Sequence, residues 1–377
     1  MADKAFYNIQ NDIMDNNQSN LLREVEKEIH RSHHEDSDEQ ALDLLKSFVN
    51  IVKAKCSIII PVEATDDMPE DWVGLNQGDE FTLKDEVRLV PKTIETKPDE
   101  KGKTEEYMVA YTNLEESFCG PETNTCTVKV GNFLNTVLFK DDVEGIIINP
   151  FGDEPFRITK DMIKELFVRC VDLGSCKADK FYEKHKEDNE PAKGIDLKDV
   201  LSYASEVYKD QCILTTDTPL LVQSMGTASL LSDLTGGPDL IVAGLLAKAV
   251  NEGLANLDDI KERFGLRAAQ ILSSQTEDKT MPWYIRKLQY LDDISKCDDI
   301  EVKVLAFTSA ISELRSIHRE CIVDDTILLV LDAPAEYMKW YYKEICKIFY
   351  LYAYEPLSEH IYAEMVALYK KVFMNVA

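Results

Sequence analysis

The stretch DLIVAGLLAKAVNEGLANLDDIKERFGLRAAQILSSQTEDKTMPWYIRKLQYLDDI, residues 239–294, decides the fold that we expect for this chain. Leu240, Ala243 and Leu246 recur at the spacing of one face of an α-helix. Asn256 follows as a typical helix cap, and the residues after it supply an acidic first turn. The stretch therefore predicts two or three consecutive amphipathic helices.

The same stretch closely resembles the HD hydrolases of the RelA/SpoT type. Their corresponding segment reads roughly DLI-AALLHDVVEDT, then LEDIEERFGEEVA, then TEDKSLPWEERK. The resemblance continues on both sides, through TTDTPLLVQSMGTASLL (215–231) and IEVKVLAFTSAISELRSI (300–317), and it spans residues 195–377 in unbroken order. It implies an all-α helical bundle, which the 3.6-residue periodicity supports independently.

The resemblance also implies a metal site, and the residues that should form it are replaced here. An HD hydrolase holds a divalent metal, often manganese, with one His, a His-Asp pair and a later Asp, and this metal lowers the pKa of a bound water. The pair is followed by two acidic residues. The matching positions of this chain are Gln223 for the first His, Ala247 and Lys248 for the pair, Asn251 and Glu252 for the acids, and Ser309 for the later Asp. We therefore predict no catalytic residue, no metal and no cofactor.

Part of the frame around that site is retained. Lys279, Arg286 and Lys287 lie in the phrase that matches TEDKSLPWEERK, and Arg315 matches a family arginine. In the family this phrase lies near the nucleotide entrance, so the resemblance implies a basic nucleotide-binding rim. The alternative is a capped turn that Trp283 packs between two helices. A retained frame without its ligands is typical of a pseudoenzyme.

The alternative hypothesis is that the protein is an enzyme whose metal site lies at other residues. It would then be a metal-dependent phosphohydrolase acting on a guanosine polyphosphate. Histidine cannot supply such a site, because none lies between His185 and His318. An oxygen-only site would draw on Asp217, Asp233, Asp239, Glu252, Asp258 and Asp259. Acids at helix starts more often cap the helix, and we favour that interpretation here.

Residues 39–170 resemble the N-terminal domain of SseB-type proteins. The family's strands, turn, hairpin and closing helix match residues 58–63, 107–117, 143–150 and 154–167, of which GIIINP (145–150) is the most specific. The resemblance implies an α+β domain and a protein-contact role rather than a reaction. The expected fold class is thus α+β followed by an all-α bundle.

Two further segments complete the expected domain organisation. Residues 1–38 are predicted to form a polar tail with a short helix; its three histidines, His30, His33 and His34, could bind a stray metal, but we favour a solvated tail. Residues 171–194 are charged and contain Pro191 and Gly194. This composition favours a linker, and the linker can include a helical piece.

Composition limits the partners and the location. The formal net charge is −27 at pH 7, which argues against broad contacts with nucleic acid or an anionic membrane. The chain lacks a signal-peptide pattern and a run of eighteen apolar residues, and its nine cysteines are an odd number. We expect a cytoplasmic protein with cysteines that are reduced.

The function that we expect is non-catalytic binding or regulation. The expected partner is another protein, a second copy of the chain, or a phosphorylated nucleotide of the guanosine-polyphosphate class. A weaker hypothesis is that the HD-like part only dimerises the SseB-like part. The aromatic segment 336–357 favours helix packing, with a partner groove as the alternative.

Overall fold

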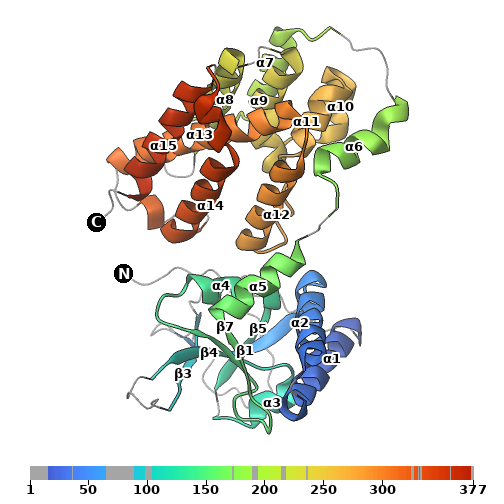
Figure 1. Cartoon of the computed structure of the whole chain (residues 1–377), viewed down its shortest axis with the longest axis vertical. Coiled ribbons are helices and arrows are strands. Elements are labelled where there is room, and N and C mark those ends of the chain that lie inside the picture. Colours follow the sequence, from blue (N-terminus) through green and yellow to red (C-terminus); the bar gives the residue numbers. More distant parts are fainter. Residues whose placement is uncertain are drawn as a thin grey trace. The chain divides into compact units, whose positions relative to one another are not determined.

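We analysed a computed structural model of the chain, which describes residues 16–35, 37–64, 89–97, 104–121, 123–171, 174–188, 194–213, 218–234, 237–323, 327–329, 331, 333–356 and 358–374. The chain divides into two compact units. The first comprises residues 1–171 and 280–285, and the second comprises residues 172–279 and 286–377. Figure 1 labels the helices and strands of both units.

The first unit combines short strands and helices. Its elements are α1 (Asn16–His34), α2 (Asp38–Lys53), β1 (Ser57–Ala64), β2 (Leu89–Pro91), β3 (Thr93–Glu95), β4 (Glu106–Ala110), α3 (Leu114–Phe118), β5 (Asn124–Lys129), α4 (Val130–Phe139), β6 (Gly145–Ile148), β7 (Phe156–Thr159) and α5 (Lys160–Cys170). Helices α2, α3 and α5 begin at side-chain caps, which are Ser37, Asn113 and Thr159.

The strands form two small sheets. One has the order β2-β1-β5 and is antiparallel, and the other has the order β3-β4-β6-β7. Within the second sheet β4 and β6 are parallel, with Met108 opposite Ile146, while the outer pairs are antiparallel. Ile59 and Tyr111 join the two sheets by a pair of backbone hydrogen bonds, 3.0 and 2.7 Å long.

The central strand β6 ends where the sequence places an Asn-Pro pair. Asn149 has a φ of 50°, a left-handed conformation that asparagine tolerates better than most residues. Its side-chain oxygen accepts a hydrogen bond from the Thr112 backbone N–H at 3.0 Å. The carboxyl ends of the parallel strands β4 and β6 are thereby held together at one edge of the sheet.

Helix α1 differs from the polar tail predicted for residues 1–38. It is nineteen residues long, and its residues Leu22, Val25 and Ile29 are at most 4% exposed. It lies against α2, where the Gln40 side chain donates a hydrogen bond to the Glu28 carbonyl oxygen at 3.0 Å. The many charged residues of this helix made its apolar stripe hard to recognise in the sequence. Burial of this stripe makes the helix part of the first unit.

The second unit is helical. Its elements are α6 (Lys177–His185), η2 (Lys186–Asp188), α7 (Leu197–Val207), α8 (Leu220–Leu234), α9 (Pro238–Asn251), α10 (Leu257–Phe264), α11 (Leu266–Ser273), α12 (Trp283–Lys296), α13 (Ile300–Val323), η3 (Ile327–Leu329), α14 (Ala335–Ile348), η4 (Tyr350–Tyr354) and α15 (Glu359–Phe373). The first three residues of α12 are counted with the first unit. Helix α9 lies within the core of the second unit, because the consecutive residues 242–247 are buried and point to all sides of the helix. The expected order, α+β followed by an all-α bundle, is confirmed.

Helices α8 and α9 pack against each other, and the Tyr208 side chain forms hydrogen bonds with both. The Tyr208 hydroxyl donates to the Leu245 carbonyl oxygen at 3.1 Å and accepts from the Ala249 N–H at 2.8 Å. The Ser224 hydroxyl donates to it as well, at 3.0 Å. Since Leu245 and Ala249 are four residues apart, the hydroxyl connects to α9 at one helical turn, directly beside residues 247–248.

The segment 171–194, expected as a linker, contains α6 and η2. Cys176 and Ala178 are at most 3% exposed and belong to the core of the second unit. The Lys177 ammonium donates a hydrogen bond to the Thr276 carbonyl oxygen. The helical piece that the sequence allowed in this linker is present as α6, and its packing into the core of the second unit was not predicted.

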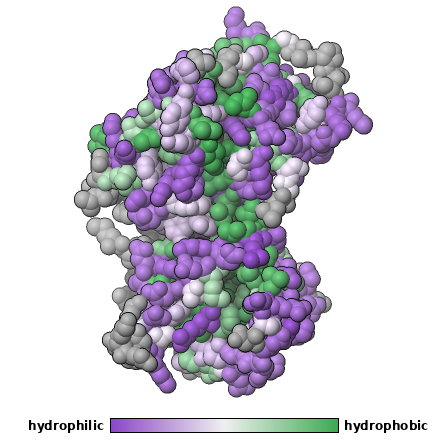
Figure 2. Space-filling view, in the orientation of Figure 1, coloured by the Kyte–Doolittle hydropathy of each residue, from purple (hydrophilic) through white to green (hydrophobic). Residues whose placement is uncertain are grey.

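Hydrophilic side chains cover most of the molecular face drawn in Figure 2, in keeping with the large net charge. Within the part of the chain that the structure describes, the helices are all too short or too polar to cross a lipid bilayer.

Candidate functional site

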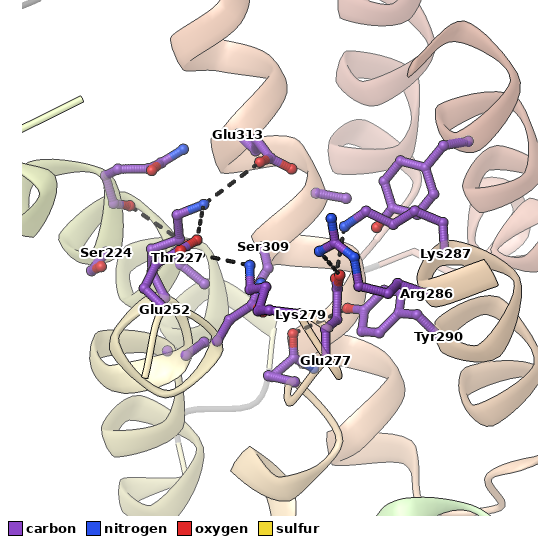
Figure 3. A pocket seen from close by; sticks show the side chains of 18 residues that line it. Ser224, Thr227, Glu252, Glu277, Lys279, Arg286, Lys287, Tyr290, Ser309 and Glu313 are labelled. Atoms are coloured by element: carbon purple, nitrogen blue, oxygen red, sulfur yellow. Dashed lines mark hydrogen bonds and ion pairs between the residues drawn. The ribbon is translucent and has the colours of Figure 1, made fainter. Parts of the chain in front are cut away.

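A pocket opens in the helical unit between α8, α9, α12, α13 and α14 and the turn before α12 (Figure 3). Its cavity volume is about 80 Å³. This is smaller than the roughly 300–1,000 Å³ of sites that enclose a drug-sized molecule, so the pocket is a shallow depression that can hold a small group such as a phosphate. Its lining is Gln223, Ser224, Thr227, Gly244, Ala247, Lys248, Asn251, Glu252, Gln275, Glu277, Lys279, Arg286, Lys287, Tyr290, Ser309, Ala310, Glu313 and Tyr341.

One side of the pocket carries an ion-pair chain built around Lys248. Its ammonium lies 3.2 Å from Glu252 and 3.9 Å from Glu313. Glu252 in turn lies 3.6 Å from Lys279. Burial pushes the pKa of Glu252 upward, but the two lysines outweigh burial and lower it, so this carboxylate stays ionised at neutral pH.

The other side holds a more deeply buried cluster. The Glu277 side chain is only 3% exposed and accepts hydrogen bonds from Arg286 at 2.9 Å and Lys287 at 2.7 Å. Burial would raise the pKa of Glu277, yet Lys287 and Arg286 together lower it. Lys287 also lies 4.9 Å from the centre of the Tyr341 ring, a cation–π contact. The pocket wall is thus fixed by charge-assisted hydrogen bonds.

Residues 201–325 match the family model described as the HD domain. The chain contains an HD domain. The match covers less than half of the chain and lies within the helical unit that carries the pocket. No curated protein matches the chain.

Two solved structures are similar to parts of the chain. One is the protein lmo0812 from Listeria monocytogenes EGD-e, with 24% identity and a TM-score of 0.37, covering 41% of this chain and 99% of that one. The other is a metazoan orthologue of SpoT, described as hydrolysing ppGpp and acting in starvation responses. It shows 16% identity and a TM-score of 0.38, and it covers 48% of this chain and 98% of its own.

The positions that correspond by resemblance to the metal ligands of an HD hydrolase all line this one pocket. They come from α8, α9 and α13, at Gln223, Ala247, Lys248, Asn251, Glu252 and Ser309. The HD domain therefore brings together at these positions two amides, a methyl, a hydroxyl, an ammonium and one carboxylate. Such a set offers a divalent cation a single anionic oxygen donor and no imidazole.

The expected basic rim is partly present in the pocket. Lys279, Arg286 and Lys287 line it, but Arg315 does not. The Arg315 guanidinium instead binds both carboxylate oxygens of Glu364 on α15, at 2.6 and 2.7 Å. Arg315 thus ties α13 to α15, and its assignment to the rim is corrected.

Two polar atoms at the positions that the resemblance aligns with the HD site have no hydrogen-bond partner within the described protein. They are the side-chain oxygens of Asn251 and Ser309, and both atoms are buried. Buried polar atoms in folded proteins are nearly always satisfied, by protein, water or ligand. The pocket floor therefore presents hydrogen-bonding capacity to whatever enters it.

The acids considered for a displaced oxygen-only site do not gather in the pocket. Of these, Glu252 alone lines it, while Asp217 lies outside the described residues. Asp239, Asp258 and Asp259 stand in the first turns of α9 and α10. Asp233 lies near the end of α8. The helix-start interpretation thus accounts for the placement of three of these acids.

Sequence reasoning missed several pocket residues. Glu313 lies four residues after Ser309 and so shares its face of α13. That spacing was a usable signal. Tyr341 reaches the pocket from α14, in the aromatic segment that we interpreted as helix packing. Tyr290 donates a hydrogen bond to the Gln275 side chain at 3.0 Å. Only the packing of α14 and α12 in the helical unit shows the contributions of Tyr341 and Tyr290.

Proposed function

We propose that the HD domain of this protein binds a phosphorylated nucleotide of the guanosine-polyphosphate class without hydrolysing it, and that the protein acts as a regulatory module. The observation that carries this proposal is the lining of the pocket. Four cationic side chains line it, at Lys248, Lys279, Arg286 and Lys287, around a space that can accept a phosphate group. Ammonium and guanidinium groups are suited to phosphate oxygens.

The chemistry of the replaced positions supports binding over turnover. A metal-dependent hydrolase needs an ion to lower the pKa of its attacking water. Lys248 places a fixed positive charge between Glu252 and Glu313, where it would repel a divalent cation. Phosphate oxygens are attracted by the same ammonium, which can exchange a carboxylate partner for a phosphate.

We propose guanosine rather than another base because residues 195–377 resemble the RelA/SpoT-type hydrolases. The buried oxygens of Asn251 and Ser309 support a ligand that carries hydrogen-bond donors, as a ribose or a guanine does. For the first unit we propose an SseB-type domain with a protein-contact role, in which nucleotide binding in the HD domain regulates a protein partner.

Calorimetry on the full-length protein tests the nucleotide proposal. Guanosine tetraphosphate is titrated at neutral pH, with and without Mn²⁺, and the nucleotide is recovered afterwards and analysed by ion-exchange chromatography. We expect saturable heat and intact nucleotide in both conditions. Lys248→Ala and Lys279→Ala should each weaken binding about tenfold, since each removes one charge contact worth roughly 1–2 kcal/mol.

The matched control is Lys198→Ala, which removes an exposed lysine on α7 outside the pocket. It should bind as the unaltered protein does. Hydrolysis in Mn²⁺ would overturn the non-catalytic proposal and favour the metal-dependent phosphohydrolase. Absence of binding would overturn the nucleotide proposal and leave protein recognition as the role of the HD domain.

A further inference from the structure

Three potential metal ligands meet in the first unit, away from the pocket. His30 and His34 are four residues apart on α1 and so project from the same face of the helix. Glu154 lies in the connection between β6 and β7. The nearest ligand atoms of the three side chains lie within 4.8 Å of one another. Both imidazoles approach the same carboxylate oxygen, Glu154 Oε1.

The spacing suits a first-row divalent cation. The His34 Nε2 atom lies 3.3 Å from Glu154 Oε1, and the His30 Nδ1 atom lies 2.7 Å from it. Ligand bonds to zinc of about 2.0–2.1 Å place neighbouring tetrahedral donors about 3.3–3.4 Å apart. One ligand–ligand distance already has this value, and the other needs His30 to move outward by about 0.6 Å. The two histidine side chains are 63% and 64% exposed, so an ion can reach them and they can adjust.

The fold holds Glu154 in place for such a site. Its loop begins at Asn149, whose side chain is anchored to Thr112 at the carboxyl ends of the parallel strands β4 and β6. On the helix side, Glu26 lies one turn before His30 on α1 and accepts a hydrogen bond from the Asn113 side chain at 2.8 Å. Both components are therefore fixed against the same edge of the sheet, where α/β folds commonly bind ligands.

An independent observation indicates a shortage of positive charge at this edge. Glu116 has a buried carboxylate oxygen with no hydrogen-bond partner in the described protein. Burial raises the pKa of Glu116, and the nearby charges of Glu26, Asp153 and Glu115 raise it further. This edge thus gathers carboxylates that a cation would stabilise.

We propose that His30, His34 and Glu154 form a zinc-binding site. Two imidazoles and one carboxylate are a donor set that zinc prefers, and three protein ligands leave a fourth position open for water or for a ligand group. The site is independent of the proposed nucleotide pocket. Under this proposal the histidine-rich end of α1 is a metal-binding site of the first unit rather than a solvated surface.

Calorimetry with Zn²⁺ on the metal-free, full-length, reduced protein tests the site. We expect one zinc ion to bind, and each of His30→Ala, His34→Ala and Glu154→Gln to lower the affinity at least about tenfold. His33→Ala is the matched control, since His33 is an exposed neighbour on the same helix outside the cluster. It should retain the affinity. Far-UV circular dichroism verifies that each variant remains folded.

Cobalt substitution separates this site from the protein's thiols, in particular from the second cluster, Cys176, Asp179 and Cys297. Co²⁺ bound by His30, His34 and Glu154 should give d–d absorption without a thiolate charge-transfer band. His30→Ala should abolish this d–d absorption. Zinc affinity unchanged in both histidine variants, an equal loss in His33→Ala, or a thiolate band from the stoichiometric ion would each overturn the proposal.

Discussion

The surroundings of Glu277 show which cations of the pocket have a structural role and which are accessible for binding. Its carboxylate is buried and neutralised by Arg286 and Lys287, which are themselves only 13% and 15% exposed. These two cations are part of the pocket wall and are held there by Glu277. Lys279, at 42% exposed, is more accessible to the phosphate that we propose to bind here. The rim therefore contains both structural and available charges.

Glu277→Gln should destabilise the protein by about 3 kcal/mol at pH 7, because it leaves two buried cations without their counter-charge. The pKa of Glu277 is lower in the folded protein than its usual value. Its stabilisation is thus full above the unfolded pKa, near 4.3, and is lost as the pH falls through the lower folded value. Urea unfolding at pH 7 and at a series of acidic pH values measures the difference between the two proteins.

The control for this prediction is Glu336→Gln, which breaks an ion pair of an exposed carboxylate with Lys339. It should cost at most about 1 kcal/mol. A Glu277→Gln protein as stable at pH 7 as this control, or a difference that does not narrow in acid, would contradict the structural role of Glu277.

Helices α8 and α9 show how element packing places the site. Gly244 faces α8, and a Cβ atom built on it would lie 2.5 Å from the Leu231 side chain and 3.1 Å from the Ala228 Cα atom. This close approach lets Gln223 on α8 and Ala247 and Lys248 on α9 line the same pocket. The sequence resemblance aligned these positions, but helix contact made them neighbours.

Gly244→Ala should therefore destabilise the HD domain by about 1–3 kcal/mol through overpacking, although alanine favours helices intrinsically. The measurement is thermal unfolding of the full chain. Gly226→Ala on α8 is the matched control, because its new Cβ would meet only the Ser312 hydroxyl, at 3.1 Å. A smaller loss is expected there. Equal melting temperatures for both variants would argue against close packing at Gly244.

At the scale of the whole molecule, the helical unit begins earlier in the chain than its family resemblance suggests. Residues 201–325 match the HD model, and the resemblance begins at residue 195. Helix α6, which precedes both, nevertheless packs against α11 through Ala178 and other core residues. The packed unit is thus larger than the recognisable domain.

A fragment of residues 174–377 should consequently melt about 5 °C higher than a fragment of residues 195–377, since the shorter one exposes the core surface that α6 covers. Differential scanning calorimetry measures the melting temperatures of the two fragments, which differ only by residues 174–194. Equal melting temperatures would show that α6 adds nothing to the stability of the unit and would restore the linker interpretation.

The sequence by itself determined the order of the architecture, and through the resemblance it predicts which positions of an HD site carry other residues. Periodicity decides helix or strand locally, and the phrases around Gln223, Ala247 and Ser309 can be aligned without coordinates. Tyr341 entered the pocket only through the packing of α14 against elements distant in sequence. Arg315 left the rim because Glu364, forty-nine positions later, binds it. The contact of His30 and His34 with Glu154 likewise spans more than a hundred residues. Which charges pair is decided by proximity and burial, and these exist only once the chain is folded.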